Sequence, residues 1–464
     1  MYVFLRKRAF CAFLLVILML ANISFAQTEV ASIGKVSEPS ASTTDSGKPL
    51  LYTSVIANYH SQTDGMMLSE IINRAFETNG EIKIARLEID KARARLIQAG
   101  LRSNPTLEVE QSSGRLVGSA GDRELSVGFA LPLDIYGQRS RRMDLARAEI
   151  TLKETEIVAR QRELAGRVFS AYTEALTSLR EIQVLEELLD LDARTVRFVQ
   201  IRVNEGETPP LELNLLQTEV DRLRARRQLV EGKLQAAISQ LKFYAGVPSE
   251  QPLRLREEIT TALIPLLPAT IETSILVGLK NRPEIRLAEL DEQLASAGLR
   301  LIRSQSRPDL TAYTRYTQGR AGFDDPRGSY FQSDRSLTFG VAIGLPVFNK
   351  NQGAKAEAEI AIRQAQERRI FAEQVIKNEV ITAFQRIEAA RRSLNILETA
   401  VLPRSRENIE TIRKVYELGE LKITDLIAEQ RKLLEANRDL TETLTERYRA
   451  QADLFIALGL TLEK

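Results

Sequence analysis

The chain has 464 residues, of which 27% are charged, 6% are aromatic and none is tryptophan. This composition favours long helices with narrow apolar stripes over large globular cores. The formal net charge is +2, and Arg6, Lys7 and Arg8 supply positive charge at the very start. The rest of the chain is close to neutral, which gives no reason to expect a nucleic acid partner.

Residues 1–26 have the pattern of an export signal peptide. The basic stretch Arg6–Arg8 precedes an uncharged apolar run over 9–20, and Ser24-Phe25-Ala26 offers small residues to a signal peptidase. An uncleaved membrane anchor is the alternative, although the apolar run is short for a span. The only cysteine, Cys11, lies in this segment. The mature chain would therefore carry no thiol, disulfide or lipid-anchored cysteine.

Residues 27–65 are rich in Ser, Thr, Pro and Gly and show no clear period, so they predict an irregular lead-in. A helical pattern covers 67–99 and stops at Ser103-Asn104-Pro105, a turn signal before proline. Strand patterns over 106–117 and 123–133 then flank a glycine-rich loop. They predict a β-hairpin within 105–135.

Residues 138–204 contain no proline and predict one very long helix, which would span roughly 100 Å. A seam of apolar residues recurs in it with coiled-coil spacing: Val168, Tyr172, Ala175, Leu179 and Ile182. A second helix is predicted over 211–244, and a glycine followed by a proline ends it. A proline-punctuated connector covers 247–270.

The second half repeats the plan of the first, which predicts one repeat over 66–246 and another over 271–464. Pro105-Thr106-Leu107 matches Pro308-Asp309-Leu310 at an offset of 203, whereas the later glycines of the two halves match at 213. About ten residues are therefore inserted in the second hairpin, predicted over 308–348. We expect them to form a longer exposed loop at its tip, over 318–333.

The most regular strand pattern lies at 337–347, where apolar residues alternate with small or polar ones. The apolar residues are Leu337, Phe339, Val341, Ile343, Leu345 and Val347, and residues 125–133 show the same alternation. Four such strands are too few to close a membrane barrel and cannot leave open edges in lipid. We therefore expect several chains to share one barrel, with the odd-numbered residues of 337–347 facing lipid. A soluble sheet packed on helices is the alternative.

Together these features resemble the TolC-like outer-membrane efflux proteins over residues 66–460. The resemblance rests on the export signal, the twofold repeat, the Pro105 and Pro308 strand starts, and the glycine turns at Gly206 and Gly419. The junctions ALPLDIYGQRS and IGLPVFNKNQG add to it. It implies a mainly α fold with a membrane β part. Long antiparallel helical hairpins would form a trimeric α-barrel tunnel, and each chain would give four strands to a shared twelve-stranded β-barrel.

The resemblance also implies a function. The segment AGLRSNPTLEVE followed by LPLDIYGQRSRR is most similar to the branch that serves cobalt-zinc-cadmium exporters of the resistance-nodulation-division (RND) type. The chain would be the channel of a tripartite efflux pump in the outer membrane of a Gram-negative cell, with its helical tunnel in the periplasm. Its implied partners are two further copies of itself, a periplasmic adaptor, an inner-membrane RND pump and outer-membrane lipid.

The cargo that this resemblance implies is heavy-metal cations, and two alternatives stay open. One is an exit duct for drugs or for a secreted polypeptide. The other, of a different class, is an exported coiled-coil scaffold without a pore.

No catalytic constellation is present, so the sequence predicts neither an enzyme nor a cofactor site. The only histidine, His60, lies in the irregular lead-in, where we expect it to be solvated, and a His/Cys metal site is excluded. No glycine loop of the kind that cradles phosphates is present, so energy for transport would come from a partner.

Two acids stand at equivalent positions of the repeats. Glu212 and Asp425 are 213 residues apart and follow Gly206 and Gly419. The resemblance implies that they narrow the periplasmic mouth of the tunnel as a ring of negative charge, that Tyr416 helps to hold the closed state, and that the two glycine turns face the adaptor. The alternative is that each acid simply occupies the first turn of a helix, where the macrodipole favours it.

Three arginines directly follow the first hairpin, at Arg139, Arg141 and Arg142. Such positions near the expected membrane edge are suitable for contact with lipid phosphates. The alternative is a solvated face or pairing between helices.

Overall fold

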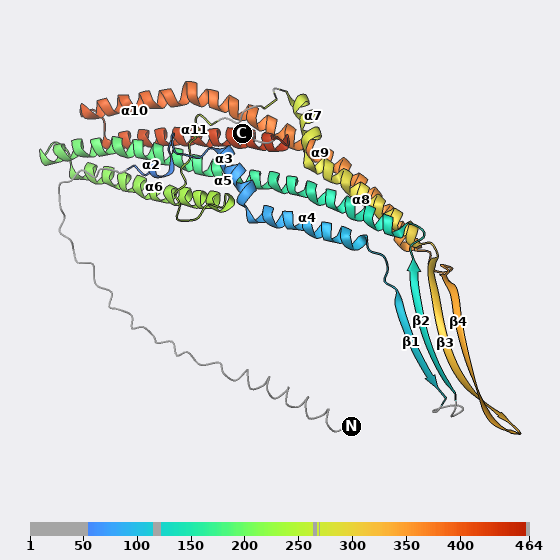
Figure 1. Cartoon of the computed structure of the whole chain (residues 1–464). Coiled ribbons are helices and arrows are strands. Elements are labelled where there is room, and N and C mark those ends of the chain that lie inside the picture. Colours follow the sequence, from blue (N-terminus) through green and yellow to red (C-terminus); the bar gives the residue numbers. More distant parts are fainter. Residues whose placement is uncertain (1–53, 115–121, 263–266, 269, 461–464) are drawn as a thin grey trace, which may run out of the picture. The chain divides into compact units, whose positions relative to one another are not determined.

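The computed structural model describes residues 54–114, 122–262, 267, 268 and 270–460. The predicted signal peptide, most of the lead-in and the tip of the first hairpin lie outside the described residues. Figure 1 shows long helices that run side by side and four strands that extend from one end of them.

The elements of the first half follow the predicted order. They are α2 (Ile56–Tyr59), α3 (Leu68–Thr78), α4 (Gly80–Ala99), β1 (Thr106–Ser113), β2 (Arg123–Leu133), α5 (Gln138–Asn204) and α6 (Pro210–Tyr244). The second half contains α7 (Ile271–Asn281), α8 (Pro283–Gln305), β3 (Asp309–Asp325), β4 (Gly328–Gly344), α9 (Gln352–Ile396), a π-helical turn η1 (Leu397–Val401), α10 (Leu402–Glu417) and α11 (Ile423–Ala457).

Helix α5 has the bounds that the sequence predicts and forms the centre of the helical part. All five predicted seam residues, Val168, Tyr172, Ala175, Leu179 and Ile182, are buried. The helix packs against α4, α6, α8 and α11. Its apolar seam therefore joins helices from both halves of the chain.

The helical stretch predicted over 67–99 is two helices, because the chain turns at Asn79. The side chain of Asn79 accepts a hydrogen bond from Glu81 N (2.8 Å) and donates one to Tyr244 O (3.2 Å). It thus caps the start of α4 and the end of α6 together. In the second half Arg282 Nη1 donates to Ala457 O (3.3 Å) at the equivalent place.

The backbone repeats as well as the sequence. Left-handed residues occur in pairs at equivalent positions: Gly206 (φ 77°) and Gly419 (φ 85°), Gly246 (φ 60°) and Gly459 (φ 64°), and Gly137 (φ 72°) and Asn351 (φ 55°). The last pair stands where a strand gives way to a long helix. Asn tolerates this region better than other residues with a side chain, so the second copy keeps the turn without glycine.

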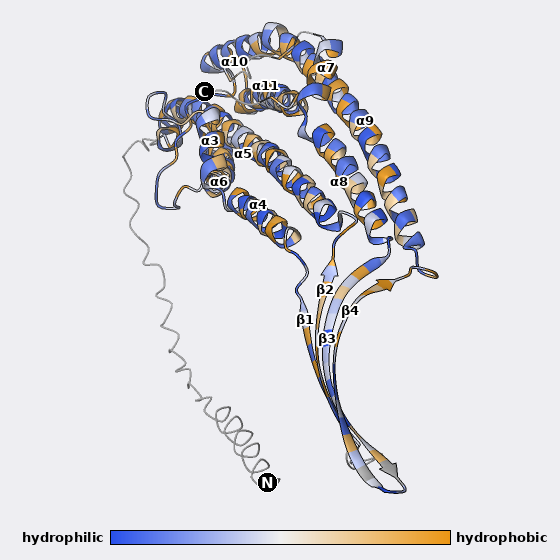
Figure 2. Cartoon of the chain, turned by 45° about the vertical axis from the view of Figure 1, so that its right-hand side comes forward, coloured by the Kyte–Doolittle hydropathy of each residue, from blue (hydrophilic) through white to orange (hydrophobic). Residues whose placement is uncertain are grey.

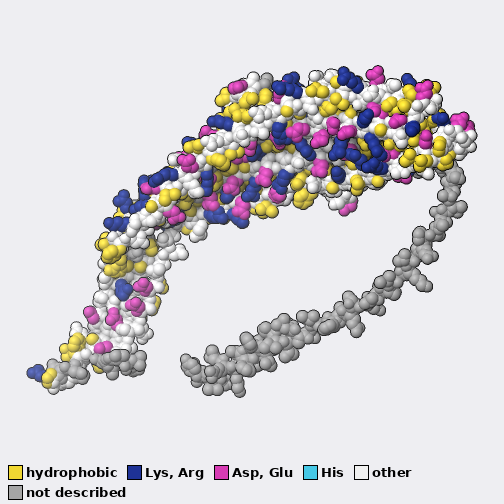
Figure 3. All heavy atoms as spheres, turned by 180° about the vertical axis from the view of Figure 1, so that it is seen from behind, with side chains coloured by type: hydrophobic (Ala, Val, Ile, Leu, Met, Phe, Trp, Pro, Cys, Tyr) yellow, Lys and Arg dark blue, Asp and Glu magenta, His cyan; other side chains and the backbone are white. Residues whose placement is uncertain are grey.

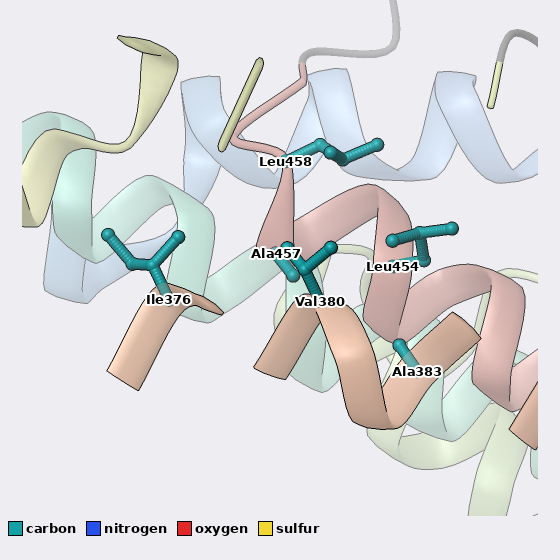
Figure 4. Close-up of a cluster of buried hydrophobic side chains, with 6 residues drawn as sticks. All are labelled: Ile376, Val380, Ala383, Leu454, Ala457 and Leu458. Carbon is teal, nitrogen blue, oxygen red and sulfur yellow. The ribbon is translucent and has the colours of Figure 1, made fainter. Parts of the chain in front are cut away.

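Helices α7, α9 and α11 meet in a small apolar cluster (Figure 4). Its buried members are Ile376, Val380, Ala383, Leu454, Ala457 and Leu458. A side chain at Gly278 of α7 would come within 3.1 Å of Ala457 O and 3.2 Å of Ile376 Cγ2. The absence of a side chain at Gly278 therefore allows α7 to pack closely against α9 and the end of α11.

The second very long helix is not continuous α-helix. The π-helical turn η1 separates α9 from α10, and Pro403 follows it at the start of α10. Proline has no backbone N–H to donate and its ring crowds the preceding turn, so a locally widened helix accommodates it. The first copy has no proline within α5 and shows no such turn.

The four strands form one antiparallel sheet in the order β1-β2-β3-β4. The expected loop over 318–333 is wrong: β3 and β4 stay paired from Asp309↔Gly344 out to Asp325↔Gly328. The residues added in the second copy lengthen the strands instead of the loop. Polar and glycine-rich residues over 318–333 are typical of a loop. The two strands nevertheless pair here, because each provides hydrogen-bond partners for the backbone of the other.

The register places the predicted apolar residues on one face. Phe129, Thr314 and Phe339 lie side by side, and so do Leu131, Ala312 and Val341. The large apolar residues of this face are exposed in the single chain, at Leu107, Val109, Leu125, Val127, Phe129, Leu131, Tyr316, Leu337, Phe339, Val341 and Ile343. Figure 3 shows that charged side chains crowd the helices and thin out over the strands.

No described helix combines the length and apolarity needed to cross a membrane. Figure 2 agrees, since polar and apolar residues are mixed along each helix.

The described end of the lead-in is more ordered than predicted. His60 pairs with Leu255 of the connector in a parallel bridge, as does Met66. The His60 side chain is only 15% exposed, and its Nε2 lies 3.8 Å from Glu258 Oε1, so the expectation of a solvated histidine is wrong.

Candidate functional site

The two helix hairpins end in turns of the same construction, at the end of the helices away from the strands (Figure 1). In the first, Gly206 N donates to Val203 O (3.1 Å) and Glu207 N to Arg202 O (2.9 Å). In the second, Gly419 N donates to Tyr416 O (2.9 Å), with a further bond from the next residue. Each glycine sits in the left-handed region that closes a helix end.

The structure brings Glu212 and Tyr416 together, although they are 204 residues apart. The Tyr416 hydroxyl donates a hydrogen bond of 3.1 Å to Glu212 Oε2. Tyr416 is at the end of α10 and is only 2% exposed, whereas Glu212 lies in the first turn of α6. Burial and the neighbouring Glu212 carboxylate raise the pKa of Tyr416, so the hydroxyl keeps its proton and donates.

Two residues that the sequence analysis missed complete this contact. The ring of Phe198 meets that of Tyr416 edge to face, with centroids 6.5 Å apart. The guanidinium of Arg202 lies over the Phe198 ring at 5.6 Å and its Nε is 3.4 Å from Glu207 Oε2. Both lie in the last two turns of α5, four residues apart. This spacing predicts from sequence that the two side chains are neighbours on one face of the helix.

The structure gives Asp425 a different, local role. Its Oδ2 accepts a hydrogen bond from Lys422 N (3.2 Å), and its own N donates to Lys422 O (3.0 Å). Asp425 is exposed in the single chain. It therefore caps α11, as the macrodipole alternative expects, while still presenting a carboxylate at this end.

The polar face of the sheet carries its own charged contacts. Arg315 Nη2 is 3.2 Å from Glu108 Oε2, and its Nη1 is 3.5 Å from Glu110 Oε2. The phenol group of Tyr313 covers Gly340, where a Cβ would come within 2.5 Å of Tyr313 Cζ. This face is thus polar and self-paired, in contrast to the exposed apolar face on the other side.

The arginines after the first hairpin contact the end of α4. Arg139 Nε donates to Gly100 O (2.5 Å), and Arg142 Nη2 donates to Leu101 O (3.4 Å) and to Asp134 Oδ2 (3.0 Å). These contacts favour the pairing alternative over a lipid role for the two residues. Basic side chains near the last carbonyls of a helix also complement its dipole.

Within the described ranges, no group of three or more His, Cys, Asp or Glu side chains is placed to hold a metal ion.

Comparison with known proteins gives consistent matches. The chain is 23% identical over 413 residues to "Cobalt-zinc-cadmium resistance protein CzcC" of Cupriavidus metallidurans, which covers 88% of this chain and 93% of that protein. It is 24% identical to "Cation efflux system protein CusC" of Escherichia coli O157:H7, with 84% of this chain and 85% of that protein covered.

Solved structures agree on the fold. A crystal structure of CusC matches with a TM-score of 0.67 at 19% identity, covering 89% of this chain and 96% of that one. The outer membrane protein VceC of Vibrio cholerae matches with a TM-score of 0.66 at 18% identity, covering 85% and 97%. The predicted fold class, mainly α with long helical hairpins and four β-strands per chain, is confirmed.

The family model described as outer membrane efflux protein matches residues 71–247 and 278–460, one segment in each half of the chain. The resemblance to TolC-like proteins is thereby confirmed. The chain belongs to the outer membrane efflux protein family.

Proposed function

We propose that this chain is the outer-membrane exit duct of a tripartite pump that expels heavy-metal cations. The main support for a duct is the sheet, which has one apolar, exposed face and one polar face. In the described chain, the outer edges of β1 and β4 are not paired with another strand. Such edges need further strands in lipid. Three copies would supply twelve strands, enough to close a barrel.

The contact between Tyr416 and Glu212 supports a gate at the periplasmic mouth. It ties the hairpin of α10 and α11 to the hairpin of α5 and α6 within one chain. An adaptor that binds the turns at Gly206 and Gly419 would pull these hairpins apart, break the hydrogen bond and widen the mouth. The duct would thus open by a shift of helices and not by chemistry.

The acids at this end support a preference for cations. Glu212 and Asp425 contribute two carboxylates per chain, and three chains would place six around the mouth. Negative charges at a constriction attract cations and repel anions, within about a Debye length of 8 Å at physiological salt. Two relatives of similar length point the same way, because CzcC is a cobalt-zinc-cadmium resistance protein and CusC is a cation efflux system protein.

The gate is tested by single-channel conductance of the purified trimer in planar bilayers. Tyr416→Phe keeps the ring and removes only the hydroxyl, so we expect more frequent or longer openings. Tyr244→Phe, at the opposite end of α6, is the control and should behave as the native protein. Closed-state leakage of Tyr416→Phe equal to the native value would contradict the gate.

The selectivity is tested with Glu212→Ala and Asp425→Ala, alone and together. We expect the double variant to lose part of its cation preference, measured as a shift of the reversal potential across a salt gradient. Since Asp425 also caps α11, Asp425→Asn separates charge from capping. An unchanged reversal potential in the double variant would refute the charged ring.

The cargo is tested in cells. A strain without the gene should become sensitive to zinc, cobalt, cadmium, copper or silver, and expression of the native chain should restore growth. Sensitivity to dyes and antibiotics alone would instead assign the duct to drugs. Loss of a secreted polypeptide from the medium would assign it to protein export.

A further inference from the structure

Three arginines lie next to one another on the apolar face of the sheet, towards the end that is far from the helices. Arg123 of β2 is paired directly with Arg320 of β3. Arg335 of β4 is paired with Gln318, which is two residues from Arg320 on the same face. All three side chains are exposed. We refer to Arg123, Arg320 and Arg335 as the outer arginine cluster.

The outer arginine cluster begins where the apolar band ends. In β2 the next residue of the same face is Leu125, and in β4 it is Leu337. The band runs from Leu125 to Leu133 in β2, which is roughly 26 Å along the strand. That length is close to the height of about 25 Å typical of the lipid-facing band of a membrane barrel. The cluster therefore lies at one boundary of the lipid.

The sheet provides no acid opposite these arginines. The positions paired directly with them, apart from the pair of Arg123 with Arg320, are Ser113, Ser333 and Gln318. Within the described residues, the side chains of Arg123 and Arg335 take part in no hydrogen bond or ion pair. The guanidinium of Arg320 is stacked on the ring of Phe331, 4.3 Å from its centroid.

The acids that neighbour the cluster along the chain are directed elsewhere. Glu124 and Asp334 fall on the opposite, polar face, because successive residues of a strand alternate. Asp122 Oδ1 accepts a hydrogen bond from Gly322 N (2.8 Å). Among the acids whose side chains the structure describes, none therefore lies on the same face as the cluster to balance its positive charge.

Like charges placed directly opposite each other destabilise a sheet, so an external anion is needed to balance them. The planar fork of arginine binds phosphate through two parallel hydrogen bonds. The strands join the helices at their other end, so the cluster lies at the outer surface of the membrane. We propose that the outer arginine cluster binds the phosphate groups of a phosphorylated lipid in the outer leaflet, once per chain of the barrel.

The proposal rests on the barrel placement of the sheet but not on the gate or the cargo, and it is tested with the purified trimer. Native mass spectrometry would count the molecules of diphosphoryl lipid A bound per trimer in a neutral detergent. Phosphatidylcholine and fully dephosphorylated lipid A serve as comparison ligands. We expect the native trimer to prefer diphosphoryl lipid A. The triple variant Arg123→Gln, Arg320→Gln, Arg335→Gln should bind it about tenfold or more weakly.

The matched control removes three exposed cations from α10, as Arg404→Gln, Arg406→Gln, Lys414→Gln. It changes the net charge equally and should leave lipid binding unchanged. Equal binding by the triple variant and the native trimer would overturn the proposal. Equal binding of dephosphorylated and diphosphoryl lipid A would also overturn it, because recognition would then lie in the acyl chains.

If the triple variant does not assemble into trimers, the single variant Arg123→Gln provides a second test of phosphate binding. Without lipid it removes a like-charge contact, so its melting temperature should equal or exceed the native value. With diphosphoryl lipid A it should gain less stability than the native trimer, because one phosphate ligand is lost. A gain equal to the native one would overturn the proposal. Unchanged conductance in planar bilayers would separate this site from the gate.

Discussion

Asp192, in the middle of the helical part, is a buried carboxyl group with no ion pair among the described residues. It is 1% exposed, and Gln430 Nε2 donates a hydrogen bond of 2.6 Å to its Oδ1. Burial is the main cause that raises its pKa to about 6, and the nearby Glu219 adds to the effect. Glu219 itself is held by Arg431, whose Nη2 is 2.6 Å from its Oε2.

The side-chain amide of Gln430 could form a second hydrogen bond with Asp192 if the Asp192 carboxyl group were protonated. Gln430 Oε1 is buried and accepts no hydrogen bond from any described residue. A protonated carboxyl group can donate to this oxygen while it accepts from Nε2, which satisfies both side chains. An ionised carboxylate can only accept. The contact between α5 and α11 is therefore better satisfied when Asp192 is neutral.

The sign of the pH effect follows from the raised pKa. Between about pH 4 and pH 6 the folded chain binds more protons at Asp192 than the unfolded chain does. The free energy of unfolding therefore falls as pH rises through this window, and the penalty is complete above it. The rise of the Asp192 pKa from 3.8 to about 6 corresponds to roughly 3 kcal/mol of unfolding free energy per chain.

We predict that Asp192→Asn stabilises the protein at neutral pH, because the Asn amide can both donate to and accept from Gln430. The difference in melting temperature between variant and native trimer should be clearly positive at pH 7.5 and should approach zero near pH 4. Differential scanning across this range measures it. A variant that is less stable than the native protein at pH 7.5 would show that the buried charge is stabilising.

At the scale of elements, the two hairpin turns need glycine because of their left-handed backbone conformation, and not because a side chain would clash with a neighbour. A Cβ at Gly206 would meet nothing within 4 Å, yet the residue has φ 77°. Gly232, in the interior of α6, is equally open but lies in a regular helix. The same substitution at the two positions therefore separates the conformational requirement from packing.

We predict opposite effects of alanine at these glycines. Gly206→Ala should lower the free energy of unfolding by about 1–2 kcal/mol, because a side chain is strained in the left-handed region. Gly232→Ala should raise it by about 0.5–1 kcal/mol, because alanine favours helix interiors. Thermal denaturation of the trimers measures both effects. Equal changes of the same sign would mean that the turn at Gly206 adopts another conformation.

The turns also provide a test of the adaptor contact. Gly206→Val or Gly419→Val should reduce export while trimers still reach the outer membrane, because the bulk lies on the surface that would meet the adaptor. Metal resistance of the cells and the amount of trimer in membrane fractions give the two measurements. Full resistance in both variants would refute an adaptor contact at these turns.

The sequence predicts elements well where a local signal is strong. Helix α5 was predicted with its bounds because no proline or glycine turn interrupts it and its seam recurs regularly. For the outer parts of β3 and β4 the sequence predicts a loop, because polar and glycine residues there hide the pairing of the strands. The division at Asn79 was missed, since it depends on contact with Tyr244, far away in the chain.

In the candidate site, too, the features with a local sequence signal could be predicted, and those that depend on tertiary contacts could not. Helix-turn glycines and first-turn acids can be located by the repeat alone, which pointed to Gly206, Gly419 and Glu212. The hydrogen bond from Tyr416 to Glu212 crosses between the two halves, so no spacing could reveal it. The spacing of Phe198 and Arg202 marks them only as neighbours on one helix, and the contact of Phe198 with Tyr416 is visible only in the folded structure. Whether Asp425 lines the mouth depends on the partner chains.

At the scale of the whole molecule, the sheet explains why a single chain is incomplete. Its apolar face is exposed, and the outer edges of β1 and β4 have no partner strand in the described chain. In lipid the exposed face is favourable, but the open edges are costly. In the proposed trimer, further copies would pair these edges and leave the apolar face outside, so insertion and oligomerisation would depend on the same four strands.

Two neighbouring residues of β4 test this arrangement. Val341 is paired with Ala312 on the apolar face, whereas Ala342 is paired with Thr311 on the polar face. We predict that Val341→Asp prevents stable trimers in the outer membrane, because one charge would enter lipid in each of three chains. Ala342→Asp should be tolerated, since its charge would meet water in the lumen. Heat-modifiable trimers in outer-membrane fractions distinguish the two, and assembly of Val341→Asp with failure of Ala342→Asp would mean that the faces are reversed.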